Sequence, residues 1–204
     1  MPMTVLSSLQ TLDTNALEFI RSTLVINAPW FHTFIELFSD SEPLAFALFL
    51  IWLWIWWVTE KHDGPKHVAL DLFWHVFGAF IIYWIINQVL PVRPRPETVS
   101  SLPPLITHIP DNSFPSGHAL FWGASWWSLH TLLRWKKVVW GFFALGLVTC
   151  LVRIIAGVHY PGDILVGFFL GWYIAHILMA LPHGKKYQYY GHELPIRFLS
   201  FFKL

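Results

Sequence analysis

Charged side chains are scarce in this sequence of 204 residues, because Asp, Glu, Lys and Arg together make up only 12% of it. A soluble globular domain carries about twice that fraction. The formal net charge is +1, so no excess of positive charge points to a nucleic-acid partner. Cysteine is nearly absent as well, and the single Cys150 can form no internal disulfide. The composition therefore argues against a soluble enzyme, a disordered chain and a nucleic-acid-binding protein.

Apolar residues make up 55% of the chain, including 13 Trp and 18 Phe. A membrane-spanning helix needs about 20 mostly apolar residues, and aromatic rings favour the headgroup boundary of a bilayer. Five stretches without Asp, Glu, Lys or Arg fit this description, at residues 43–59, 72–92, 112–133, 138–152 and 164–184. The sequence therefore predicts an all-α fold, a polytopic membrane helix bundle with five spans.

The N-terminal residues 1–42 differ from the rest because charged residues interrupt their apolar runs. Either Asp13 or Thr14 is suited to begin a helix whose apolar side chains share one face. We expect an amphipathic segment at the membrane interface here, with a weak sixth span as the alternative. The predicted organisation is this segment at 1–42, a transmembrane domain at 43–184 and a cytoplasmic tail at 185–204.

The lysines predict how the spans are oriented. All seven lie at 61–66, 136–137 and 185–203, which share one side if there are five spans. With two arginines, that side has nine basic residues and the other has four. The positive-inside rule makes the lysine-rich side cytoplasmic. We expect a multi-pass protein of the cell (inner) membrane, with a cytoplasmic C-terminus and with the 91–115 loop and the 154–163 turn on the periplasmic or extracellular side.

Five ionisable residues gather at the predicted outer ends of the spans: Arg95, His118, Arg153, His159 and Asp163. Ionisable groups at membrane depth are costly, so such a cluster indicates function. Arginine offers a planar fork to phosphate oxygens, and histidine serves as a nucleophile or an acid. Ser116 and Gly117 stand at a predicted helix start, where free N–H groups favour a bound phosphate. The combination is typical of phosphoryl transfer.

Three motifs in this region resemble those of the type 2 phosphatidic acid phosphatase (PAP2) superfamily. The third motif matches Arg153, His159 and Asp163 in identity and spacing, the second matches FPSGH at 114–118, and the end of the first matches Arg95-Pro96. The resemblance covers roughly residues 43–181. The short chain and its N-terminal segment are most similar to bacterial undecaprenyl-diphosphate phosphatases of this superfamily.

The resemblance implies a role for each matching residue. His159 would be the nucleophile and form a phosphohistidine, Asp163 would orient it, and His118 would protonate the leaving oxygen. The phosphate oxygens would be bound by Arg95, Arg153, Ser116 and the Gly117 amide. The family needs no metal or other cofactor, and its substrate partners are lipid phosphates or diphosphates in the membrane.

The sequence departs from the family pattern at two positions. Gln88 stands where the first motif normally has Lys, and Val152 stands where the third normally has Ser. Arg93 lies two residues from Arg95 in a proline-stiffened stretch, and it is a candidate to replace the lysine as a phosphate ligand. A solvated loop charge is the competing interpretation of Arg93.

Each of these residues also has a simpler interpretation when taken alone. Asp163 is typical of a helix N-cap, the histidines of an interface, and Arg153 of a snorkelling side chain. The joint pattern favours a functional site, the resemblance implies hydrolysis of undecaprenyl diphosphate, and the lysine distribution places that site at the outer face. The alternatives are another lipid phosphate (phosphatidylglycerol phosphate, phosphatidic acid or a lipid A phosphate), a lipid phosphotransferase, and a non-enzymatic scaffold. The oligomeric state stays open.

Overall fold

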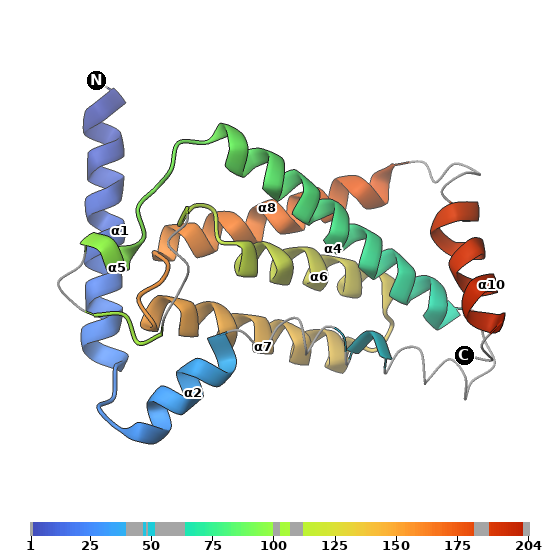
Figure 1. Cartoon of the computed structure of the whole chain (residues 1–204), viewed down its shortest axis with the longest axis horizontal. Helices are drawn as coiled ribbons and strands as arrows, with labels where there is room; N and C mark the ends of the chain where they lie inside the picture. Colours follow the sequence, from blue (N-terminus) through green and yellow to red (C-terminus); the bar gives the residue numbers. More distant parts are fainter. Residues whose placement is uncertain are drawn as a thin grey trace.

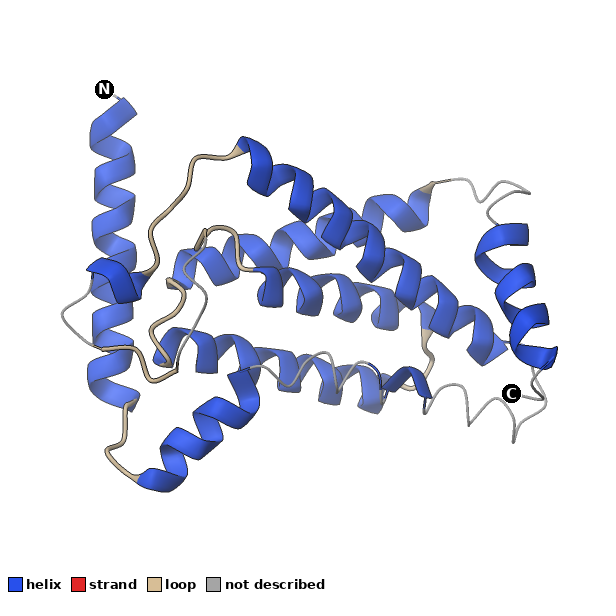
Figure 2. Cartoon of the chain, in the orientation of Figure 1, coloured by secondary structure: helices blue, strands red, loops and turns tan. Residues whose placement is uncertain are grey.

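The computed structural model describes residues 2–39, 47, 49–51, 64–99, 103–106, 112–181 and 188–201. Every regular element within these ranges is a helix, as Figure 2 shows, so the all-α prediction is confirmed for this part of the chain. The predicted span at 43–59 lies largely outside the described residues. Its membrane crossing stays a prediction.

Four helices form the bundle: α4 (Gly64–Val89), α6 (Gly117–Leu132), α7 (Lys136–Ile155) and α8 (Pro161–Ala180). They run alongside one another in Figure 1, and α6 packs most extensively against α8. The last turns of α4 and α7 lie at the same end of the bundle as the first turns of α6 and α8. The short helix α5 (Pro96–Val99) lies at that end, which we call the α1 end because α1 crosses it.

Three described helices are long and apolar enough to cross a membrane. They are His67–Val89, Lys136–Ile155 and Pro161–Ala180, at the predicted spans 72–92, 138–152 and 164–184. Helix α6 has only 16 residues, fewer than the predicted span at 112–133, because the chain before it forms a loop. That loop ends at Ser116, whose hydroxyl oxygen accepts a hydrogen bond from the Ala119 amide at 3.4 Å and so caps α6.

Glycines let α6 and α8 approach at backbone distance. A Cβ atom added at Gly171 would lie 2.0 Å from the Leu120 carbonyl oxygen, and one added at Gly123 would lie 2.0 Å from that of Phe168. Small residues at such crossings allow membrane helices to pack closely through van der Waals contact. This contact fixes the first two turns of α6 against the middle of α8.

Replacing Gly171 with Ala is expected to lower the thermal midpoint of the protein in detergent. The added methyl group overlaps the Leu120 carbonyl, and overpacking of this kind costs about 1–3 kcal/mol, or roughly 2–12 °C. Gly141→Ala on α7 is the matched control, because no atom lies within 4 Å of its Cβ position. Equal midpoints for the two variants would contradict the close contact.

The N-terminal residues form two helices, α1 (Pro2–Leu24) and α2 (Pro29–Ser39). Helix α1 runs crosswise to the bundle in Figure 1 and packs against α7 and α8. The prediction that Asp13 or Thr14 begins a helix is wrong, because both lie inside α1. At the opposite end of the bundle are a π-helix, η1 (Gln188–Glu193), and α10 (Leu194–Phe201). The interfacial position of residues 1–42 stays a prediction.

Candidate active site

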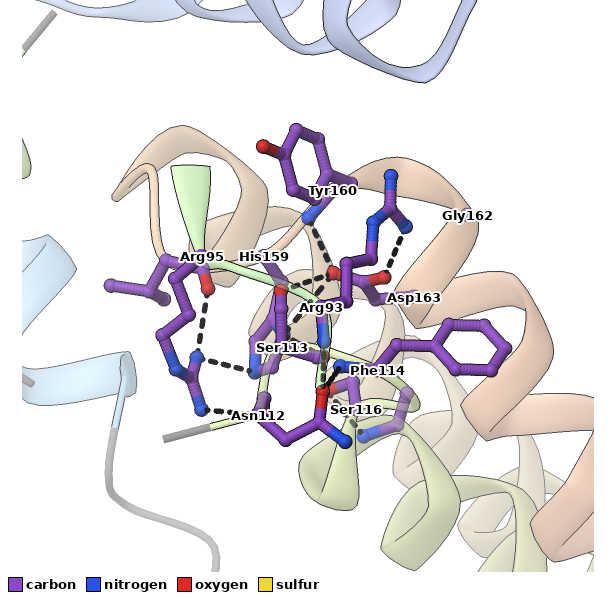
Figure 3. A network of polar contacts seen from close by, with 12 residues as sticks. Arg93, Arg95, Asn112, Ser113, Phe114, Ser116, His159, Tyr160, Gly162 and Asp163 are labelled. Atoms are coloured by element: carbon purple, nitrogen blue, oxygen red, sulfur yellow. Dashed lines mark hydrogen bonds and ion pairs between the residues drawn. The ribbon is translucent and has the colours of Figure 1, made fainter. Parts of the chain in front are cut away.

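The polar cluster lies at the α1 end of the bundle, where three connections meet. These are the loop after α4, the loop before α6 and the turn between α7 and α8. Figure 3 shows their side chains converging on His159 and Asp163. The structure thus brings the first and third predicted motifs together with the loop that leads into the second. The catalytic roles themselves stay predictions.

Asp163 is fully buried at the third position of α8 and accepts several hydrogen bonds. Its Oδ2 accepts from the Ser113 hydroxyl at 2.5 Å and from the Tyr160 amide at 2.9 Å, and its Oδ1 accepts from Arg93 Nη1 at 2.5 Å. The prediction that Asp163 is the N-cap is wrong by three positions, because Tyr160 is the N-cap and Pro161 opens the helix. The carboxylate satisfies the N-cap amide and is held in one orientation.

His159 is buried, and its two ring nitrogens have different neighbours. Nδ1 lies 3.0 Å from the Ser113 carbonyl oxygen and 3.6 Å from Asp163 Oδ2, while Nε2 lies 3.3 Å from Arg95 Nη1. A carbonyl can only accept a hydrogen bond and a guanidinium can only donate one. This network assigns the proton to Nδ1 and leaves a lone pair on Nε2.

The surroundings of His159 keep its ring neutral near pH 7. Burial lowers the pKa of His159 from its ordinary value of 6.5 to about 4, and the positive charges of Arg95 and Arg153 act in the same direction. The hydrogen bond and charge of Asp163 oppose the shift without cancelling it. A neutral imidazole with a directed lone pair is the nucleophilic form of histidine.

The two predicted phosphate-binding arginines are both buried, but they have different partners. Arg95 Nη1 donates to the Val158 carbonyl at 2.8 Å and faces His159 Nε2. Arg153 Nη1 donates to the backbone and side-chain oxygens of Ser39, at 3.0 and 2.9 Å. Arg95 therefore lies directly beside His159 Nε2, whereas Arg153 binds the end of α2.

The start of α6 joins the site through its backbone. The Ser116 amide donates to the Asp163 carbonyl at 3.1 Å, which ties the start of α6 to that of α8. Gly117 faces Tyr83 of α4, whose ring lies 3.3 Å from the Cβ position of the glycine. His118 stands in the first turn of α6 and is partly exposed.

Two further residues of the loop before α6 organise the site, and neither was predicted from the sequence. Ser113 contacts both His159 and Asp163, as described above. The Asn112 side-chain oxygen accepts from the amides of Arg93, at 2.9 Å, and Phe114, at 3.2 Å. Asn and Ser commonly bond to nearby backbone in this way, so their position directly before the FPSGH motif was the available signal.

A buried neutral imidazole flanked by a guanidinium and a carboxylate is suited to accept a phosphoryl group and to stabilise the resulting charge. No group of three or more His, Cys, Asp or Glu in the described ranges is arranged to hold a metal ion. Helices of membrane-spanning length carry this site. Fold and site together define a membrane enzyme of the phosphoryl-transfer class.

Comparison with known proteins identifies the family. The profile of the PAP2 superfamily matches residues 68–187, more than half of the chain, so the chain belongs to the PAP2 superfamily. The sequence is 35% identical to undecaprenyl-diphosphatase BcrC of Bacillus subtilis over 127 residues, which are 62% of each chain. It is 25% identical to the putative undecaprenyl-diphosphatase YbjG of Escherichia coli over 96% of this chain and 93% of that one.

The crystal structure of Aquifex aeolicus LpxE shares the fold, with a TM-score of 0.65 and 23% identity, over 81% of this chain and 95% of that chain. The predicted family is thereby confirmed, and the names of the matched relatives support the predicted class of enzyme, a lipid phosphatase. The lipid on which it acts is a separate question.

Proposed function

We propose that this protein hydrolyses undecaprenyl diphosphate to undecaprenyl phosphate through a phosphohistidine on His159. The observation that carries the proposal is the neutral His159 ring, with Nε2 beside Arg95 and Nδ1 beside Ser113 and Asp163. The names of the two relatives, BcrC and YbjG, support the choice of lipid. An active site at one end of membrane helices suits a substrate whose long tail stays in the bilayer.

The reaction proceeds in two displacements at the terminal phosphorus. His159 Nε2 attacks, the N–P bond forms, and the bridging P–O bond breaks as its electron pair leaves with undecaprenyl phosphate. His118 donates its proton to that oxygen, and the charge of Asp163 offsets the positive phosphoimidazole. Water then attacks phosphorus, gives its proton to His118 and restores the lone pair of His159 as phosphate departs. Arg95 and Arg153, with Ser116 and the Gly117 amide, hold the phosphate oxygens.

The experiment that tests this function is phosphate release by the purified protein in detergent with EDTA. The panel contains undecaprenyl diphosphate, undecaprenyl phosphate, phosphatidylglycerol phosphate and phosphatidic acid. We expect the highest kcat/KM for the diphosphate, with undecaprenyl phosphate accumulating as the product. A clear preference for a monophosphate would contradict the proposed substrate, and transfer of phosphate to a second lipid would contradict hydrolysis.

We also propose that the α1 end of the bundle faces outward, a placement supported by the lysine distribution. Thr98 belongs to this end and Gly64 to the opposite one. In a Cys150→Ala background, an impermeant thiol reagent is expected to label Thr98→Cys on intact cells and Gly64→Cys only after lysis. The reverse pattern would place the active site in the cytoplasm.

A further inference from the structure

Arg93 connects the N-terminal helix α1 to the catalytic carboxylate. Its Nη1 donates to Asp163 Oδ1 at 2.5 Å, and its Nη2 donates to Asp13 Oδ2 at 2.7 Å. The Tyr160 ring lies against the same guanidinium, 4.0 Å from Cζ to the ring centroid. We propose that Asp13 is a positioning residue for phosphoryl transfer and acts through Arg93 on Asp163. This inference rests on the proposed function.

Asp13 uses both of its carboxylate oxygens. While Oδ2 faces Arg93, Oδ1 accepts from the Gly162 amide at 2.7 Å, one of the N–H groups in the first turn of α8 that lack an intrahelical partner. A Cβ atom at position 162 would lie 2.7 Å from Asp13 Oδ2, so only glycine leaves room for this contact. An amide side chain has one acceptor oxygen and cannot replace both bonds.

A second charged residue of α1 fixes the helix at the other side of the same turn. Arg21 is buried, and it donates from Nε to the Ile155 carbonyl at 3.1 Å and from Nη2 to the Pro103 carbonyl at 2.5 Å. Gly157, with φ of +80°, leaves the space that this guanidinium fills. Helix α1 thus places the negative charge of Asp13 at the N-terminus of α8 and the positive charge of Arg21 at the C-terminus of α7. Both placements are favourable for the helix dipoles.

Asp13, Arg93 and Asp163 form a row of three charges, in which the Arg93 guanidinium binds the carboxylates on both sides. Burial acts to lower the pKa of Arg93, but the charges and hydrogen bonds of Asp163 and Asp13 together outweigh it and raise that pKa. Arg93 therefore stays cationic. By taking part of this charge, Asp13 leaves more of the negative charge of Asp163 to face His159. This role differs from the phosphate ligand predicted for Arg93, because its charge is committed to protein carboxylates.

The direction in which each substitution shifts the pKa of His159 follows from this arrangement. In Asp13→Asn the positive charge of Arg93 is less compensated, which disfavours a positive ring on His159 and lowers its pKa. In Arg93→Gln the cation is gone, so Asp163 favours a positive ring and the pKa of His159 rises. Asp163, Arg95 and Arg153, the charged groups that act on the pKa of His159, are retained in both variants. Since the nucleophile must be neutral, the acid limb of kcat moves to lower pH in the first variant and to higher pH in the second.

The test is the pH dependence of kcat for wild type, Asp13→Asn and Arg93→Gln on undecaprenyl diphosphate. The matched control is Glu18→Gln, which removes an exposed acid from the same helix. We expect the acid limb to move in opposite directions by roughly 0.5–1 unit, and kcat to fall about tenfold with little change in KM. The control is expected to match wild type. Titration of the substrate is common to all four proteins and cancels.

The pH at which the acid limb of kcat falls does not depend on how much of the enzyme is folded. A lower yield of folded variant therefore leaves the comparison intact. Unshifted limbs, shifts in the same direction, or an Arg93→Gln effect confined to the KM of the diphosphate would overturn the inference. If His159→Ala keeps wild-type activity, the proposed function fails on that result alone. If only the limb shifts are missing, the proposed function stands and the role of Asp13 does not.

Discussion

His159→Ala is expected to lose phosphate release by roughly 10⁴-fold or more on every substrate, because the variant lacks the imidazole proposed to form the covalent intermediate. Its KM is expected to stay within a few-fold of wild type, since Arg95 and Arg153 still face the site. Phosphate release in detergent under single-turnover conditions measures this loss. The matched control is His176→Ala, an exposed histidine on α8. Near-normal turnover in His159→Ala would remove the nucleophile from this account.

The loss of kcat in His118→Ala is expected to depend on the leaving group of the substrate. A lipid monophosphate expels an alkoxide, whose conjugate acid has a pKa of roughly 16, whereas a lipid diphosphate expels a phosphate monoester with a second pKa of about 6. General acid catalysis is worth about 10²–10⁴-fold, and less for a good leaving group. We therefore expect a much larger loss of kcat on a long-chain monophosphate than on the matching diphosphate.

An aryl phosphate extends this comparison, because its phenol has a pKa of about 10 or lower. Activity of His118→Ala is expected to be partly rescued on that substrate, and His159→Ala is expected to show no rescue. The ratio of wild-type to variant kcat across the three substrates is the measurement. An equal loss on all three would show that His118 holds phosphate or structure and delivers no proton.

The elements predicted well from the sequence are those whose signal is local. Long apolar runs marked α4, α7 and α8, and four-residue spacing brought His159 and Asp163 into contact across one helix start. Helix α6 is shorter than its apolar run because Ser116 caps it after a polar loop. The N-cap of α8 was harder to predict, because the Asp163 carboxylate at the third position of the helix accepts a hydrogen bond from the amide of the N-cap residue, Tyr160.

The contacts missing from the sequence analysis join residues far apart in the chain. Asp13 is of a residue type that favours helix starts, yet its partner amide belongs to Gly162, 149 residues away. Ser113 contacts His159 through its backbone carbonyl and Asp163 through its hydroxyl. A pattern of side chains in the sequence cannot predict the contact of a backbone carbonyl. Arg93 was identified as a charge near the site, but its two carboxylate partners depend on where α1 docks.

The central claim is covalent catalysis by His159, and trapping the phosphoenzyme tests it most directly. The purified protein is mixed with undecaprenyl diphosphate labelled at its terminal phosphate, quenched within one turnover, and mapped by peptide. We expect label on the peptide that contains His159, labile in acid, stable in base and absent from His159→Ala. Turnover of the labelled lipid by wild type with no label on that peptide at any quench time, together with an active His159→Ala, would contradict the account.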